Sequence, residues 1–192
     1  MSQIVVLTGI PGSGKTTVTR KAIEKLEARG HRLRMVTYSD IMLDEALKRG
    51  LVQVRDEIRK LAPQKQRELQ SIAARLIADM ATTSLVVDTH ATMRTPKGYL
   101  PGLPTWVLDE LKPDIILVVE AAPEEIIRRR NTDKSRNRDV QDERGILEHQ
   151  EINRAICMAY AAHTGATVKI LQNPDGKLSE AVQELMVTLQ AY

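Results

Sequence analysis

The sequence predicts an α/β fold in three layers, with a five-stranded parallel sheet flanked by helices. Short apolar runs recur along the 192 residues, and amphipathic segments separate them. Because apolar runs without polar alternation are typical of strands covered on both faces, a parallel sheet is favoured over an antiparallel one. Strands that alternate with helices also have the connectivity that a parallel sheet requires. We expect the strand order 2-3-1-4-5 and a single domain over residues 1–192.

The expected elements follow one another in regular alternation. The expected strands are 4–8, 33–38, 84–89, 115–120 and 167–171. The expected helices are 16–29, 40–49, 52–61, 63–82, 105–111, 123–131, 145–163 and 179–189. Pro63 and Pro123 begin helices, where the missing N–H of proline costs little. Gly30 and Gly165 lie where helices are expected to end.

Two stretches lack helical or strand periodicity. Residues 91–103 contain two prolines and two glycines, and residues 131–144 are almost wholly polar. We expect both to be irregular loops that project from the carboxyl ends of strands. Irregular connections of this length inside a domain are usually functional, although a plain surface loop is the alternative for each.

The charge of the chain is compatible with a phosphate ligand and with a nucleic acid, and its aromatic content argues against a dedicated single-strand nucleic-acid platform. The net charge is only +3, and the chain contains no Phe and one Trp. Few aromatic rings are available for base stacking, so we expect no obligatory nucleic-acid partner. Cys157, the single cysteine, is expected to be a buried thiol, which fits a reducing cytoplasm. No signal peptide or membrane-spanning run is visible, so we expect a cytoplasmic protein without a membrane partner.

The strongest motif follows the first expected strand. Residues 9–16 read Gly-Ile-Pro-Gly-Ser-Gly-Lys-Thr, a full match to the phosphate-binding pattern G-x-x-x-x-G-K-[ST]. In such a loop Lys15 would reach the β- and γ-phosphates and the Thr16 hydroxyl would ligate Mg²⁺. The residues expected to contact the nucleotide are Gly9, Ile10, Pro11, Gly12, Ser13, Gly14, Lys15, Thr16 and Thr17. The motif predicts a nucleoside triphosphate site, against the alternative of a plain glycine-rich turn.

An acidic residue at a strand end supplies a second candidate metal ligand. Asp88 ends the apolar run 85–88, as does a Walker B carboxylate that holds Mg²⁺ directly or through water. Glu120 also ends an apolar strand and is the weaker alternative. We therefore expect Thr16 and Asp88 to hold the metal.

Arginines form two groups along the chain. The later group surrounds the polar stretch and comprises Arg128, Arg129, Arg130, Arg136 and Arg138. Planar guanidinium groups bind phosphoryl oxygens bidentately, and a closing lid that carries them would exclude water. The alternative is a solvated helix end with salt bridges.

The earlier arginine group could bind a second phosphate. Arg55 and Arg59 are four residues apart on an expected helix and would share a face, and Arg94 follows Asp88 by six residues. The alternative is that these are ordinary surface charges. Taken together, they suggest that an acceptor phosphate is bound opposite the triphosphate.

General bases are scarce near these cations. Only Asp40 and Asp88 are well-placed carboxylates, and we interpret His90 as structural. An alcohol acceptor needs a base for its proton, whereas a phosphate monoester is already largely ionised at pH 7. Many arginines with few bases therefore favour a phosphate acceptor.

The chain resembles the nucleoside monophosphate kinases, and most closely the archaeal-type adenylate kinases. The resemblance extends over essentially the full length. The segments that carry it are 8–17, 55–61, 87–90, 95–104, 136–139 and 165–170. The phosphate loop occurs in many families, whereas the segment that follows Val-Asp-Thr-His at 87–90 is more specific.

The resemblance implies a P-loop kinase fold that converts Mg·ATP and AMP to two ADP, and a homotrimer. It implies an acceptor-nucleotide insertion at 39–82 and a short lid at 131–144. The residues implied to be catalytic are Lys15, Arg94, Arg136 and Arg138, and those implied to bind the acceptor are Arg55, Arg59 and Arg94. Residues 173–176 resemble the turn that borders the ATP adenine.

Two departures from the wider family bear on these roles. Asp44 stands where general adenylate kinases place an AMP-binding arginine, which leaves that role to Arg55 or Arg59. The lid contains no cysteine, so no structural zinc is expected there.

Three alternative functions stay open from the sequence. The first is a kinase for another nucleoside monophosphate. The second is a kinase for a small alcohol, with Asp40 or Asp88 as base. The third is a non-metabolic nucleotide-dependent switch or RNA-associated factor.

Overall fold

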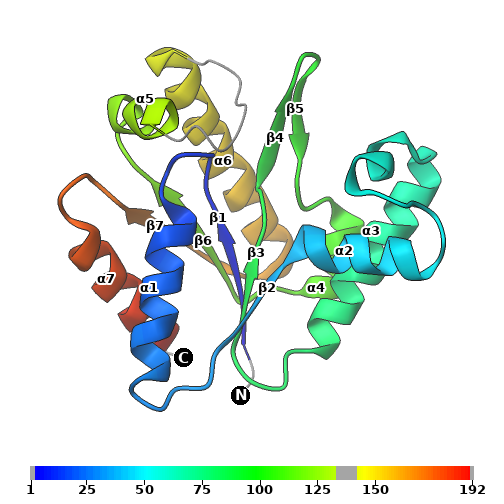
Figure 1. Ribbon diagram of the computed structural model, residues 1–192, viewed down its shortest axis with the longest axis horizontal. Coiled ribbons are helices and arrows are strands. Elements are labelled where there is room, and N and C mark those ends of the chain that lie inside the picture. Colours follow the sequence, from blue (N-terminus) through cyan, green and yellow to red (C-terminus); the bar gives the residue numbers. More distant parts are fainter. Residues whose placement is uncertain (1–2, 133–141, 191–192) are drawn as a thin grey trace.

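The computed structural model describes residues 3–132 and 142–190, and it has the expected three layers (Figure 1). The parallel sheet has the order β2-β3-β1-β6-β7. Its strands are β1 (Ile4–Thr8), β2 (Arg34–Thr37), β3 (Leu85–Asp88), β6 (Ile115–Glu120) and β7 (Thr167–Gln172). Counted among themselves along the chain, these five strands have the predicted order 2-3-1-4-5.

Helices cover both faces of the sheet (Figure 1). The α-helices are α1 (Lys15–Glu27), α2 (Tyr38–Lys48), α3 (Pro63–Asp79), α4 (Thr105–Leu111), α5 (Pro123–Thr132), α6 (Glu143–Thr164) and α7 (Leu178–Gln190). Among the described residues, no helix is long and apolar enough to cross a membrane.

The central strand β1 divides the core into two apolar layers. Its side chains alternate between the sheet faces, as the two-residue period of a strand requires. Val5 and Leu7 pack with residues of α1 and α7 in one cluster. Ile4 and Val6 pack on the opposite face with residues of α3, α4 and α6, among them the fully buried Cys157. The prediction of a buried thiol is thereby confirmed.

The sheet brings the phosphate-loop segment and Asp88 to the same edge. β1 pairs in parallel with both β3 and β6, and Leu7 lies opposite Asp88 in the β1–β3 register. The loop begins directly after β1 and ends where α1 starts at Lys15. This is the edge at which ligands bind in open α/β sheets.

The first difference from the sequence expectation is a β-hairpin within residues 91–103. β4 (Thr92–Thr95) pairs antiparallel with β5 (Gly98–Pro101), and the hairpin projects beyond the sheet edge (Figure 1). The prediction of an irregular loop was wrong. Pro96 and Lys97 form the connection, and Gly98 has a φ of 117°, so these turn residues close a hairpin.

The second difference lies in the expected helix 52–61. Only Arg55–Lys60 is helical, and it is a 3₁₀ helix, η1. The Glu57 carboxylate accepts backbone N–H bonds from Gln53 (2.6 Å) and Val54 (3.3 Å), which stops the helix from extending backwards. A 3₁₀ helix has about three residues per turn, so residues four apart are rotated by roughly 120°. The shared face predicted for Arg55 and Arg59 is therefore wrong.

Candidate active site

Close backbone packing shapes the phosphate-loop segment. Gly9, Gly12 and Gly14 have φ angles of 154°, 95° and 85°, a region that side chains disfavour. A Cβ on Gly9 would lie 2.5 Å from the Val119 carbonyl oxygen, and one on Gly14 would lie 2.2 Å from Asn173 Nδ2. Glycine is thus required here both for conformation and for space.

Within the loop, Ser13 is fully buried, and its Oγ has no hydrogen-bond partner in the part of the chain that the structure describes. Leaving a buried hydroxyl unpaired costs about 1–3 kcal/mol, so such groups are usually satisfied by a ligand or by water. The loop therefore offers an unused donor, as well as its backbone N–H groups, to an anion.

Lys15 and Asp88 form an ion pair across the β1–β3 edge. Lys15 Nζ donates to the Asp88 carboxylate and to the Thr89 carbonyl oxygen (3.1 Å). The two charged side chains are only 11% and 16% exposed, so solvent screens the pair weakly. The pair thus holds the motif lysine at the carboxyl end of β3.

The oxygen atoms beside the loop have the chemistry that a hard cation prefers. The exposed Thr16 lies in the first turn of α1, and the half-buried Asp88 ends β3. The described residues contain no group of three His, Cys, Asp or Glu side chains able to hold a metal ion. Mg²⁺ is commonly bound by one or two protein oxygens together with substrate phosphates, and the residues present fit that mode.

Glu120, the weaker candidate for a metal ligand, is bound within the protein. It is 1% exposed and accepts Arg154 Nε at 2.8 Å and Gln172 Nε2 at 3.2 Å. Its carboxylate oxygens accept hydrogen bonds from an arginine of α6 and an amide of β7, so Glu120 joins β6 to these two elements.

The arginine run 128–130 on α5 contacts protein oxygens behind the loop. Arg129 donates to the Ser13 carbonyl oxygen at 3.2 Å and to the Asn173 carbonyl oxygen at 2.8 Å. Arg130 Nε donates to the Pro11 carbonyl oxygen at 2.8 Å. Arg128 and Arg129 both pair with Asp175. Arg129 and Arg130 thus hold the loop in place, whereas the Arg128 guanidinium pairs with Asp175. The sequence had related all three only to phosphate and to solvated ion pairs.

Asn173 is a further loop contact that sequence reasoning missed. It follows β7, is 5% exposed, and donates from Nδ2 to the Ser13 carbonyl oxygen at 2.9 Å. The sequence indicated only a turn at 173–176. The cue available in the sequence was an amide side chain directly after the fifth strand, at the sheet edge that carries the loop.

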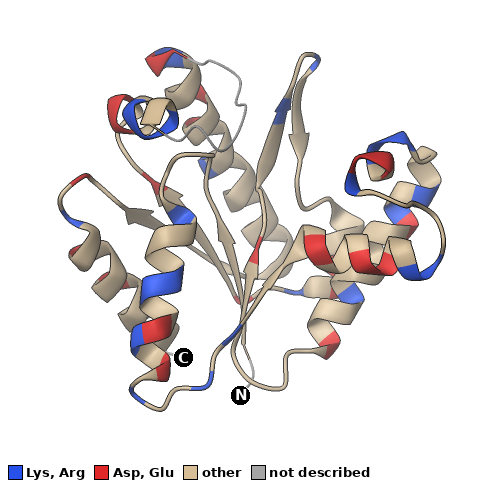
Figure 2. Cartoon of the chain, viewed as in Figure 1, with Lys and Arg blue, Asp and Glu red and all other residues tan. Residues whose placement is uncertain are grey.

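The arginines assigned to the acceptor lie on exposed elements. Arg94 is on β4 and forms no ion pair with any described residue, and Arg59 lies exposed in η1. Arg55 donates to Ser39 Oγ at 3.0 Å and pairs with Asp40 at 2.5 Å. Figure 2 shows basic residues on α5 and on the hairpin, on either side of the loop. Arg136 and Arg138 lie outside the described residues.

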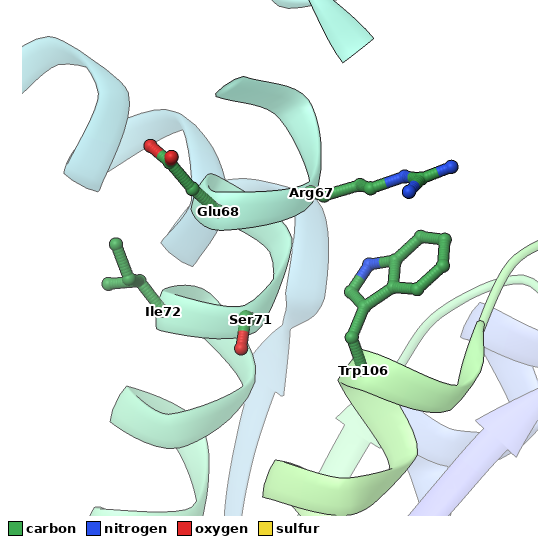
Figure 3. A pocket seen from close by; sticks show the side chains of 5 residues that line it. All are labelled: Arg67, Glu68, Ser71, Ile72 and Trp106. Carbon is green, nitrogen blue, oxygen red and sulfur yellow. The ribbon is translucent and has the colours of Figure 1, made fainter. Parts of the chain in front are cut away.

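A groove of about 370 Å³ lies away from the loop, on α3 and α4. Its lining residues are Arg67, Glu68, Ser71, Ile72 and Trp106 (Figure 3). The Arg67 guanidinium lies 4.8 Å from the centre of the Trp106 ring, and Trp106 Nε1 donates to Gln70 at 3.0 Å. These contacts join α3 to α4 and bring no further titratable cluster to the site.

Comparisons with known proteins agree with the sequence and the fold. A family model described as an AAA domain matches residues 8–146. Shikimate kinase from Bacteroides thetaiotaomicron superposes with a TM-score of 0.59 at 15% identity, over 99% of both chains, which shows a shared fold.

Archaeal sequences match much more closely. An adenylate kinase of Methanopyrus kandleri is 53% identical over 194 residues and the full length of both chains. One of Methanocaldococcus jannaschii is 50% identical over 98% of this chain and 99% of its own. The phosphate loop after β1 and the likeness along the whole chain lead to one conclusion: the chain belongs to the adenylate kinase family of nucleoside monophosphate kinases.

Proposed function

We propose that this chain transfers the γ-phosphoryl group of Mg·ATP to AMP, reversibly, and yields two ADP. The observation that carries the proposal is the phosphate loop after β1, which contains a buried Ser13 hydroxyl without a partner among the described residues and a lysine that pairs with Asp88 at the carboxyl end of β3. Family membership supports adenylate as the acceptor. In the forward direction an AMP phosphate oxygen forms a bond to the γ-phosphorus while the bond to the ADP bridging oxygen breaks.

The donor nucleotide is proposed to lie in residues 9–17. Lys15 would donate to phosphate oxygens, because its ammonium group has three N–H donors and contacts only Asp88 and the Thr89 carbonyl oxygen among the described residues. Its charge would then oppose the negative charge that develops on the transferred group. The backbone N–H groups of the loop and the N-terminus of α1 would bind the β-phosphate.

Thr16 and Asp88 are the residues that we propose to hold Mg²⁺. Both supply hard oxygen donors, and ATP would supply the rest of the ligands. When bound, the cation supplies neutralisation of the phosphate charge. We propose that the divalent metal used is Mg²⁺.

The acceptor phosphate is proposed to be bound by Arg94 with Arg55 or Arg59, from the hairpin and the 39–82 insertion. AMP needs no base to become a nucleophile, because its phosphate is already largely ionised at pH 7. Catalysis then depends on holding two anions in line against their repulsion. Arg136 and Arg138, in the proposed lid at 131–144, would complete the set of cations.

A coupled assay that offers ATP with AMP, CMP, UMP or GMP in turn tests the proposal. We expect ADP formation that depends on AMP and is much slower with the other three. ADP formation that ignores every monophosphate would contradict the transfer reaction and favour an alcohol kinase or a nucleotide switch. A switch would also show slow hydrolysis and salt-dependent RNA affinity.

We further propose a homotrimer in a reducing cytoplasm, on the basis of the resemblance to archaeal-type enzymes and of the single cysteine. Sedimentation equilibrium is expected to give three times the chain mass of 21.5 kDa. A monomer at micromolar concentration would contradict the trimer and leave the reaction as proposed.

A further inference from the structure

The hairpin that carries Arg94 is fastened to α6 by three buried polar side chains. Thr92, His149 and Asn153 are 6%, 4% and 2% exposed. Thr92 Oγ1 lies 3.0 Å from His149 Nε2 and donates to Asn153 Oδ1 at 2.5 Å. The three side chains link the first residue of β4 to two successive turns of α6. Buried polar contacts of this kind fix geometry because leaving one unmade is costly.

Counting hydrogen atoms assigns the histidine tautomer. The Thr92 hydroxyl has one hydrogen, and it is used toward Asn153. His149 Nε2 must therefore carry a proton and donate it to Thr92 Oγ1. The buried Nδ1 has no hydrogen-bond partner among the described residues. The hydrogen bonding of the imidazole within that part of the chain is therefore directed to Thr92, on the hairpin.

A second contact joins the same histidine to the hairpin face that bears Arg94. Tyr99 packs on His149 with ring centroids 5.0 Å apart, and its hydroxyl donates to Glu148 at 3.1 Å. Tyr99 and Arg94 are directly opposed across the β4–β5 register. Cross-strand partners project from the same face of a hairpin, so the Arg94 side chain extends beside the Tyr99 ring that covers His149.

The base of the hairpin is tied to the phosphate-loop strand and to α6. The Ala91 N–H donates to Thr8 Oγ1 at 2.7 Å, directly before the loop. The Tyr160 hydroxyl of α6 donates to the Ala91 carbonyl oxygen at 2.9 Å. These contacts fix where the hairpin starts, whereas Thr92, His149 and Tyr99 fix the direction in which it leaves the sheet.

We propose that His149 is a positioning residue that acts through Thr92 and Tyr99 to hold Arg94 toward the acceptor phosphate. The inference rests on the proposed acceptor role of Arg94. It assigns to α6, the helix that follows the proposed lid, an indirect part in acceptor binding. The proposed role of His149 requires no contact with either nucleotide.

The test compares His149→Leu, which has similar volume and no donor, with His149→Gln, whose amide nitrogen can donate to Thr92 in place of Nε2. We expect His149→Leu to raise the KM for AMP about tenfold or more and to leave the KM for ATP nearly unchanged. An ångström-scale misplacement of a positioning group costs up to about 100-fold. His149→Gln is expected to recover most of the loss.

Gln150→Leu is the matched control. Gln150 is the next residue of α6, is 4% exposed, and accepts a hydrogen bond from the Ala121 N–H, away from the hairpin. It should lower thermal stability as His149→Leu does and leave the KM for AMP unchanged. Thr92→Val removes the same bond from the hairpin side and serves if His149→Leu does not fold.

A double-mutant cycle with Arg94→Ala separates this inference from the proposed function. If His149 acts through Arg94, adding His149→Leu to Arg94→Ala gives no further rise in the KM for AMP. Independent, additive effects would overturn the positioning role, as would equal rises in the KM for AMP and ATP. An Arg94→Ala variant with an unchanged KM for AMP would instead contradict the acceptor role of Arg94, whatever His149→Leu shows.

Discussion

The proposed donor side and the proposed acceptor side of the site are held in different ways. Behind the phosphate loop, the Ser13 and Pro11 carbonyl oxygens accept hydrogen bonds from Asn173, Arg129 and Arg130. On the proposed acceptor side, the exposed Arg94 has no ion pair within the described residues, and the exposed Arg55 contacts Ser39 and the exposed Asp40. On the first side the loop itself is hydrogen-bonded to the protein, whereas on the second side the arginine side chains are exposed.

This difference indicates which side of the site is already ordered before substrate binds. A loop fixed by its own protein contacts presents its N–H groups to a phosphate without further ordering, which is the preorganisation that electrostatic catalysis needs. Exposed arginines lose side-chain freedom when they bind an anion. Substitutions on the donor side should therefore affect turnover and ATP, and those on the acceptor side should affect AMP selectively.

The largest effect is expected from Lys15→Ala. Removing one preorganised charge contact to a transition state costs at least about 10²-fold in kcat. Turnover at saturating ATP and AMP measures it, with Lys21→Ala, an exposed lysine on the same helix, as the control. Near-normal turnover of Lys15→Ala would remove this residue from the proposed mechanism.

Arg94→Ala tests the open side. Loss of a hydrogen bond to a charged group, roughly 1.5–3 kcal/mol, corresponds to about a 10- to 100-fold rise in the KM for AMP. The KM for ATP should stay nearly constant. Lys97→Ala, in the turn of the same hairpin, is the control and should change neither constant. Equal effects of Arg94→Ala on both substrates would place Arg94 outside the acceptor site.

Asn173→Ala probes the packing behind the loop. The Ser13 carbonyl oxygen keeps its bond from Arg129, so the loop should loosen without collapsing. A lost hydrogen bond of about 0.5–1.5 kcal/mol predicts at most about a tenfold rise in the KM for ATP, with the KM for AMP unchanged. Gln172→Ala, whose amide binds Glu120 instead, is the neighbouring control. A selective effect on AMP would reverse the proposed division of the site.

The sheet could be predicted from the sequence because its signals are local. Strands covered on both faces require unbroken apolar runs, and 115–120 was placed to the residue. The loop after β1 follows from a motif whose glycines have no substitute at their φ angles. The hairpin was missed since its strands are four residues each, the first with polar side chains and the second with Gly and Pro, which are depleted in strands. Its signal was the Pro-Lys-Gly turn, which closes a hairpin.

Contacts between distant segments could not be predicted in the same way. His149 and Thr92 are 57 residues apart, and Asn173 and Ser13 are 160 apart. No spacing along the chain indicates that an amide will meet a carbonyl oxygen or an imidazole a hydroxyl. These contacts depend on how the helices lie on the sheet. The motifs of the site could therefore be predicted from the sequence, whereas the hydrogen bonds that hold its loop and hairpin could not.

Stability at low pH should depend on His149. Burial, followed by the charge of Arg130, holds the pKa of this imidazole below its ordinary value of 6.5. A hydrogen bond with the Thr92 backbone opposes this shift, and the charges of Arg94 and His90 add smaller lowering effects. The unfolded chain then binds the proton more readily than the folded chain. The contribution of the neutral His149 to the free energy of unfolding is therefore fully present above pH 6.5, and it is lost as the pH falls through the pKa of the folded state.

Thermal unfolding from pH 7.5 downward measures this effect. The Tm of the natural chain should fall more steeply below pH 6.5 than that of His149→Gln, which has no group to protonate at this position. All other titrating groups are shared by the two proteins and cancel in the comparison. Parallel Tm profiles would show that the buried imidazole is not the group responsible.

The smallest effect is expected from Asp40→Asn, which opens the acceptor side further. Arg55 and Asp40 form an ion pair in which the two side chains are 50% and 56% exposed. Removing the Asp40 charge should therefore change the free energy of unfolding by less than about 1 kcal/mol. If Arg55 binds the acceptor phosphate, Asp40 competes with AMP for the guanidinium group. The KM for AMP should then fall by at most about fivefold, the ratio that corresponds to such an energy. Asp44→Asn, exposed on the same helix, should leave it unchanged, and a rise with Asp40→Asn would mean that Asp40 orients Arg55 toward the acceptor.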